Sequence, residues 1–177
     1  RLSDYHRCCA RAFALAPNDP GIRLGLARAM ISHGDAVSAE ALLSEATKER
    51  PEDGDAWLEL ARLRRWTATE NHVESLERAV AVTSNPRSKA ASCYALYKEL
   101  DDVGLTTHAM SWLQSGAKSL RSTFSYSAET DEAALARIAL SFPDERLRHA
   151  PSNGPGRGAI FVVGLPRSGT TLVDRIL

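Results

Sequence analysis

The chain has 177 residues, 44% of them hydrophobic, which suffices for one ordinary domain and part of a second. Lysine plus arginine and aspartate plus glutamate both number 22, so no excess of positive charge favours a nucleic-acid partner. No apolar run approaches the roughly 20 residues of a membrane-spanning helix. We therefore expect a cytoplasmic protein with no membrane span. Because Arg1 falls within a helical pattern, we also expect the sequence to begin inside a longer chain.

The cysteines and histidines do not indicate a metal site. The three cysteines are an odd number without ligand spacing, and no two of the five histidines stand four positions apart. We therefore expect no metal cofactor, and free thiols in a reducing compartment.

A repeat of about 34 residues organises the first two thirds of the chain. The repeated prolines are Pro17, Pro51 and Pro86, and the repeated leucines are Leu26, Leu60 and Leu96. A glycine followed five positions later by an alanine also recurs, as Gly34 with Ala39 and as Gly104 with Ala109. Between these residues the apolar positions have helical spacing.

This pattern predicts pairs of antiparallel helices. A glycine can adopt the left-handed conformation that ends the first helix of a pair, and a proline ends the second. A small alanine lets the two helices approach closely. One pair cannot bury its apolar face alone, so neighbouring pairs stack into an α-solenoid. The sequence thus predicts a mainly α-helical module over residues 1–121.

The repeated residues resemble the tetratricopeptide repeat. The similarity is good over 18–51, moderate over 52–86 and confined to the second half of 87–121, while 2–17 is similar to the closing helix of an earlier repeat. The second unit departs from the family pattern, because Val73 or Glu74 stands where a small alanine is usual. A plain run of antiparallel helix pairs is the alternative interpretation.

A cation stands two residues beyond each repeated leucine, as Arg28, Arg62 and Lys98. In the family that the repeats resemble, this position lines the concave groove, so the three cations would form a basic ladder. Such a ladder would suit an acidic or C-terminal peptide. The other interpretation is an ordinary solvated helix face.

Residues 122–158 are expected to form a linker with one helix. Apolar residues within 131–142 have helical spacing, whereas 150–158 contains two prolines and three glycines and is typical of a boundary loop. A second domain is then expected to start at residue 159.

Residues 159–177 carry the most specific pattern. The apolar run at 159–163 predicts a strand buried on both faces, a glycine-rich loop extends from Gly164 to Thr171, and residues 172–177 have helical spacing. A strand, a loop and a helix in this order hold phosphate groups, because the loop amides and the helix N-terminus point at the anion.

The loop differs from the nucleotide-binding P-loop in the place of its cation. Gly164 and Gly169 have the P-loop spacing, but Thr170 stands where that motif has lysine, and the positive charge lies on Arg167. This difference favours another phosphate-bearing donor. A metal-dependent nucleotide site is the alternative.

Residues 160–172 resemble the 5′-phosphosulfate loop of sulfotransferases, especially of bacterial proteins that carry tetratricopeptide repeats ahead of that domain and of tyrosylprotein sulfotransferases. The resemblance implies an α/β domain and the co-substrate 3′-phosphoadenosine-5′-phosphosulfate. It also implies sulfuryl transfer to a hydroxyl or amine, such as a peptide tyrosine. By matching position, the residues that hold the 5′-phosphosulfate would be Arg167, Ser168, Gly169, Thr170 and Thr171.

The general base and the 3′-phosphate site of that family would lie beyond Leu177, so we expect this chain alone to be inactive. The repeats are expected to bind the acceptor, which is a protein, a peptide or a small molecule. The alternative function is a repeat-based protein-interaction scaffold whose nucleotide-binding domain is inactive or incomplete.

Overall fold

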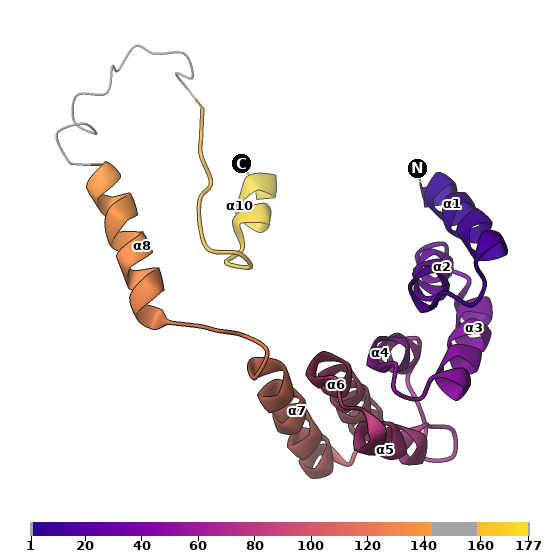
Figure 1. The fold of residues 1–177 in the computed structure, drawn as a ribbon. Coiled ribbons are helices and arrows are strands. Elements are labelled where there is room, and N and C mark those ends of the chain that lie inside the picture. The colour runs from indigo at the N-terminus through magenta and orange to yellow at the C-terminus, as the bar shows by residue number, and fades with distance from the viewer. Residues whose placement is uncertain (1, 143–158, 177) are drawn as a thin grey trace. The chain divides into compact units, whose positions relative to one another are not determined.

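The computed structural model describes residues 2–142 and 159–176. They belong to two units, residues 1–125 and residues 126–177. Figure 1 shows the first unit as a succession of helices from α1 to α7, and the second unit with α8 and α10. The boundary between the units lies a few residues after the predicted end of the repeats.

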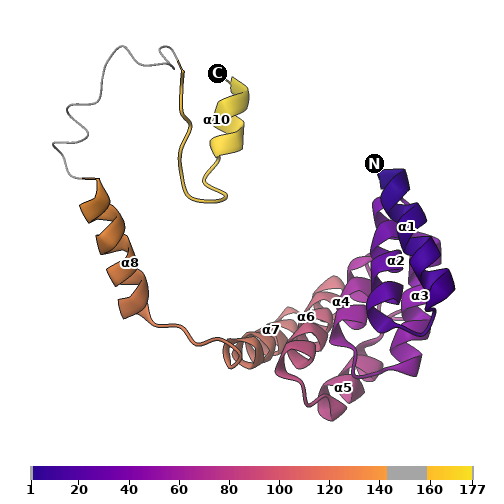
Figure 2. The ribbon, with the colours of Figure 1, turned by 45° about the horizontal axis from the view of Figure 1, so that its top comes forward.

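Helices that pair as repeats make up the first unit. They are α1 (Leu2–Leu15), α2 (Pro20–Ser32), α3 (Ala36–Glu49), α4 (Gly54–Arg62), α5 (Val73–Val82), α6 (Pro86–Asp102) and α7 (Thr106–Arg121). The most extensive contacts join α1 to α2, α2 to α3, α4 to α6 and α6 to α7. Figure 2 shows α4, α6 and α7 following one another in a row, with α5 to one side of it. The predicted helical repeat module is therefore confirmed.

The ends of the helices follow from local sequence. The side chains that accept backbone N–H groups at the starts of α2, α3, α4 and α6 are Asp19, Asp35, Asp53 and Asn85. After α2 and α6, Gly34 and Gly104 have φ angles of 86° and 83°, in the left-handed region where glycine is favoured. The helix-ending role predicted for these two glycines is confirmed.

The three repeated leucines are buried, one on each of the first helices α2, α4 and α6. Leu26, Leu60 and Leu96 are 4%, 0% and 0% exposed. Ala39 and Ala109, the fourth residues of α3 and α7, are fully buried where these helices approach their partners. The predicted burial of the three leucines is confirmed.

The second repeat differs from the others by a three-residue insertion. Its leucine, Leu60, and the fourth residue of its second helix, Leu76, are 16 positions apart, whereas the leucine and the alanine of the first and third repeats are 13 apart. Leu76 is fully buried like those alanines. We predicted that Val73 or Glu74 would occupy the position of the small alanine. That prediction is wrong, because it did not allow for the three-residue insertion, and Leu76 occupies this position.

Trp66 and His72 lie in the segment that connects α4 to α5, which the insertion lengthens. Trp66 is 3% exposed, and its ring lies edge-on to His72 with 4.4 Å between ring centroids. Its Nε1 donates a hydrogen bond to the Ala61 carbonyl at 2.9 Å. The Glu99 carboxylate on α6 accepts the His72 backbone N–H at 2.5 Å and lies 2.9 Å from His72 Nδ1. We call Trp66, His72 and Glu99 the wedge cluster.

The first turn of α6 lies directly against the start of α4. The Ser88 hydroxyl accepts the Gly54 backbone N–H at 2.7 Å and donates to the Glu52 carbonyl. A Cβ atom on Gly54 would lie 1.9 Å from the Ser88 carbonyl oxygen, which is far inside van der Waals contact. The approach of these two helices therefore requires glycine at this position.

We expect Gly54→Ala to lower the free energy of unfolding by roughly 1–3 kcal/mol, because the backbone of α6 must shift to relieve the overlap. Gly25→Ala in α2 is the matched control, because its added Cβ would meet nothing within 4 Å. That control should raise stability by about 0.5–1 kcal/mol through helix propensity. Urea denaturation measures both, and similar effects of the two changes would contradict the close approach.

The second unit contains α8 (Ala128–Ser141) and α10 (Thr170–Ile176), so the helix predicted in the linker and the helix predicted after the loop are both present. The predicted boundary loop at 150–158 lies outside the described residues. The predicted strand at 159–163 is not formed, and Phe161 and Val163 are 82% and 86% exposed. A strand needs hydrogen-bonded neighbours, and none of the described residues supplies one. No part of the described chain therefore forms the predicted α/β sheet.

Candidate functional site

A hollow of about 290 Å³ lies in the second half of the helical unit. Its lining residues come from α4, α6 and α7 and are Leu58, Arg62, Tyr94, Tyr97, Lys98 and Leu113. We call it the Arg62 hollow. It combines an apolar and aromatic lining with two cations, which suits a ligand that carries both an apolar group and a negative charge.

Arg62 is the free cation of this hollow. Its side chain is exposed, and within the described part of the chain it has no hydrogen-bond or ion-pair partner. Tyr94 and Tyr97 stand three positions apart on α6 and therefore lie on the same side of that helix. A ligand carboxylate at Arg62 would thus have aromatic surface close by.

Lys98 lines the same hollow but is held by the protein. Its Nζ lies 2.5 Å from Asp102 Oδ2 and also donates to the Arg64 carbonyl, and its side chain is 26% exposed. The same Asp102 oxygen accepts the Trp66 backbone N–H at 2.9 Å. Lys98 therefore joins α6 to the loop after α4, and its charge is already compensated.

Arg28 is compensated as well. Its Nε donates to Glu59 Oε1 at 2.8 Å, which joins α2 to α4. Glu59 stands three positions before Arg62, so the two side chains are neighbours on one side of α4. Of the three cations predicted as a ladder, the structure thus brings Arg62 and Lys98 together around one hollow and pairs Arg28 on α2 with Glu59 on α4.

The sequence interpretation overlooked several residues of this site. Glu59 could have been found, because an acid three positions from a predicted groove cation is visible in the sequence. Leu58, Tyr97 and Leu113 could not have been separated from core residues by spacing alone. Arg65, in the loop after α4, donates to the backbone carbonyl of Asp102 at 3.4 Å, and the side chain of the same Asp102 pairs with Lys98.

The second candidate site is the loop from Gly164 to Gly169. It turns sharply, with the Ser168 backbone N–H donating to the Leu165 carbonyl at 3.1 Å. Arg167 and Gly169 have φ angles of 65° and 90°, and Ser168 Oγ lies where a Cβ on Gly164 would come within 2.5 Å. A non-glycine residue at positive φ is uncommon and costs conformational energy, as at many ligand-binding turns.

The side chains of this loop have no hydrogen bonds to other described residues. Thr170 is half-buried at the first position of α10, whereas the other candidates for the phosphosulfate are exposed. Those exposed residues are Arg167, Ser168, Gly169 and Thr171. The loop is therefore open to an anion, with one permanent cation and three hydroxyl groups available as donors.

Two further features bear on the class of site. Within residues 2–142 and 159–176, no group of histidine, cysteine, aspartate and glutamate side chains is arranged to hold a metal ion. Among the same residues, no helix has the length and apolar character needed to cross a membrane.

Comparison with known proteins identifies the first half of the helical unit. Residues 8–63 match the tetratricopeptide repeat. This match extends from α1 to the residue after α4 and thus covers the first complete pair, α2 with α3. The matched residues include Leu26 and Leu60, two of the recurring leucines, and Gly34, the glycine that follows α2.

An uncharacterized protein of Aquifex aeolicus (strain VF5) is similar to most of this chain. The two are 24% identical over 163 residues, which is 91% of this chain and 21% of that protein. The chain thus spans about a fifth of the length of this relative. No solved structure matches the chain.

Proposed function

We propose that the tetratricopeptide repeats form a peptide-binding module whose Arg62 hollow takes an acidic segment of a partner protein. Such repeats generally mediate protein interactions. The observation that carries the proposal is the free arginine beside Tyr94 and Tyr97, next to two cations that are already compensated.

The chemistry of the hollow favours a carboxylate with an apolar neighbour. A guanidinium binds a carboxylate through two parallel N–H groups, and tyrosine rings beside it offer apolar surface at little entropic cost. Leu58 and Leu113 would contact an aliphatic side chain of the ligand. Arginine and tyrosine are also the residues on which binding energy most often concentrates in protein interfaces.

Replacing Arg62 with glutamate should weaken binding of an acidic peptide by about tenfold, because attraction to the carboxylates becomes repulsion. The probe is a synthetic peptide with one leucine flanked on each side by two glutamates, and we call it the acidic peptide. Titration is followed through the backbone amide resonances of Tyr94 and Tyr97. Arg11→Glu, the same charge change at an exposed arginine of α1, is the matched control and should alter affinity by less than about twofold.

Arg28 and Lys98 serve as less direct tests. Arg28→Glu should have a smaller effect than Arg62→Glu, because Arg28 is already paired with Glu59. Lys98→Glu would also remove the contact to Asp102 and lower stability, so it does not report on binding alone. Equal affinities of the wild-type protein and the Arg62→Glu variant would refute the proposed site.

We also propose that residues 159–176 contribute the donor loop of a sulfotransferase with the co-substrate 3′-phosphoadenosine-5′-phosphosulfate. The resemblance of residues 160–172 to the phosphosulfate loop supports this, and so does the open turn with left-handed backbone at Arg167 and Gly169. In this proposal the repeats bind the acceptor, and the donor supplies the sulfuryl group that passes to an acceptor hydroxyl or amine.

The residues of the loop fit the terminal group of that donor. Arg167 would hold the 5′-phosphosulfate with a forked, permanently charged group, and the loop amides and the hydroxyls of Ser168, Thr170 and Thr171 would add neutral donors. Gly164 leaves the space that Ser168 needs to fold across the turn. Charge that spreads over the equatorial oxygens during sulfuryl transfer is stabilised best by such fixed donors.

Arg167→Ala should weaken binding of adenosine 3′,5′-bisphosphate by about tenfold to a hundredfold, because it removes a charge-assisted contact of roughly 1.5–3 kcal/mol. The measurement is calorimetry on the longest natural polypeptide that contains this sequence. Arg167→Lys should recover part of the loss, since a point charge cannot replace the fork. Binding should persist in EDTA. ATP binding that disappears on chelation would instead identify a metal-dependent nucleotide site.

A further inference from the structure

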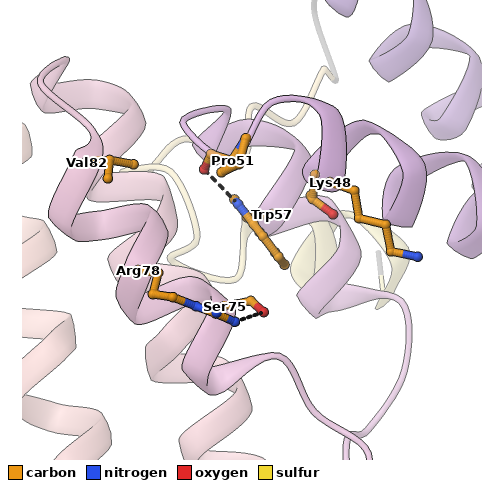
Figure 3. Close-up of a pocket in the computed structure, with 7 residues that line it drawn as sticks. Lys48, Pro51, Trp57, Ser75, Arg78 and Val82 are labelled. Atoms are coloured by element: carbon orange, nitrogen blue, oxygen red, sulfur yellow. Dashed lines mark hydrogen bonds between the residues drawn. The ribbon is translucent and has the colours of Figure 1, made fainter.

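A second hollow, of about 380 Å³, lies between α3 and α5 on the side of the second helices, and Figure 3 shows its lining. The residues that line it are Thr47, Lys48, Pro51, Trp57, Ser75, Arg78 and Val82. We call it the outer hollow. It is separate from the Arg62 hollow, because Trp57 and Arg62 stand five positions apart on α4 and so point about 140° apart around the helix.

The irregular second repeat accounts for this space. α3 packs against α2 and α4, whereas α5 packs against α6, and the wedge cluster separates α5 from α4. The Trp57 ring therefore lies between Pro51 and the residues of α5, with its Nε1 held by the Pro51 carbonyl at 3.0 Å (Figure 3). Trp57 is 5% exposed, so its ring presents only a small surface at the floor of the hollow, while Val82 at the edge is 67% exposed.

The charged residues that line the outer hollow have one sign. Its two charged lining residues are Lys48 and Arg78, and both are exposed. Arg78 donates to the Ser75 hydroxyl at 3.1 Å and to the Glu74 carbonyl at 3.2 Å, and neither cation is paired with a carboxylate among the described residues. In Figure 3 the Arg78 side chain runs along α5 toward Ser75, and Lys48 extends outward from α3.

We infer that the outer hollow is a docking site for an acidic segment of a partner protein. One aliphatic side chain of that segment lies against Val82 and the small exposed surface of Trp57, and flanking carboxylates lie at Lys48 and Arg78. A small-molecule site would enclose most of its ligand, whereas this hollow is open to the surface and suits a side chain that projects from a larger partner. The charge complementarity between two unpaired cations and an acidic segment identifies the partner's chemistry.

The test is a titration of the whole chain with the acidic peptide, followed through the indole N–H resonance of Trp57. We expect weak binding, with a Kd of roughly 0.1–1 mM, because one side chain is buried and both cations are exposed. The double variant Lys48→Glu and Arg78→Glu should weaken this binding by about tenfold. A peptide with glutamine in place of every glutamate should bind the wild-type protein about as weakly as the acidic peptide binds the double variant.

The two hollows are distinguished by reciprocal variants. Arg62→Glu should leave the Trp57 response unchanged, and the Lys48 and Arg78 double variant should leave the responses of Tyr94 and Tyr97 unchanged. A Trp57 resonance that does not move at about 5 mM peptide would overturn the inference. Two other results would overturn it as well: equal affinities of the glutamine peptide and the acidic peptide at Trp57, or loss of the Trp57 response in the Arg62→Glu variant. Neither result bears on binding at Tyr94 and Tyr97.

Discussion

Replacing Trp66 with alanine is expected to lower the free energy of unfolding by roughly 3–5 kcal/mol, the range for removing a large buried aromatic side chain. Trp66 is 3% exposed, packs edge-on against His72, and donates a hydrogen bond to the Ala61 carbonyl. α4 and α5 make little direct contact, so the packing of Trp66 contributes to the core that joins them. Urea denaturation followed by circular dichroism measures the loss.

A pair of phenylalanine variants separates the hydrogen bond of Trp66 from its volume. Trp66→Phe removes the bond to Ala61 and should cost about 1–3 kcal/mol. Trp112→Phe is the control, because the buried Nε1 of Trp112 has no partner among the described residues and little is lost with it. A larger cost for Trp112→Phe than for Trp66→Phe would contradict the role given to Trp66.

Replacing Glu99 with alanine is expected to cost roughly 1–3 kcal/mol, because it leaves the backbone N–H of His72 without its acceptor. Glu99 is fully buried and accepts the His72 backbone N–H at the start of α5, where the side chain of the capping residue His72 makes no cap of its own. Glu99→Gln keeps an acceptor for that N–H and should cost less. Urea denaturation of the two variants compares them directly.

Trp66 and Glu99 should also be energetically coupled, since both act on His72. The double change to alanine should cost less than the sum of the single changes, by about 0.5–3 kcal/mol in a double-mutant cycle. Strict additivity would show that the wedge cluster is not one structural unit.

These predictions concern the part of the fold that local sequence could not reveal. Gly34, Gly104 and the repeated leucines were predictable, because a helix end and a repeated core position depend on nearby residues. The wedge cluster was not, because Glu99 and His72 are 27 positions apart and meet only when α6 packs beside α5. The insertion before Leu76 was missed for the same reason, since its effect appears only in the packing of the pair.

The candidate sites also contain some features that local sequence predicts and others that depend on packing. The exposed position of Arg62 follows from the repeat, whereas the compensation of Lys98 by Asp102 depends on how α6 meets the loop after α4. The Gly164–Thr171 loop was visible in the sequence because its spacing is local. The strand expected at 159–163 is not formed, since an extended segment becomes a strand only beside a hydrogen-bonded neighbour.

The most direct test of the peptide-binding proposal locates the acidic peptide on the protein. A spin label on the peptide broadens the resonances of nearby amides. In the Lys48→Glu and Arg78→Glu background, which weakens binding at the outer hollow, we predict loss of signal at Leu58, Tyr94, Tyr97 and Leu113 that Arg62→Glu largely removes. The same experiment with Arg11→Glu should retain the broadening. Broadening that spares these four residues, or that persists unchanged in the Arg62→Glu variant, would contradict recognition of acidic segments at the Arg62 hollow.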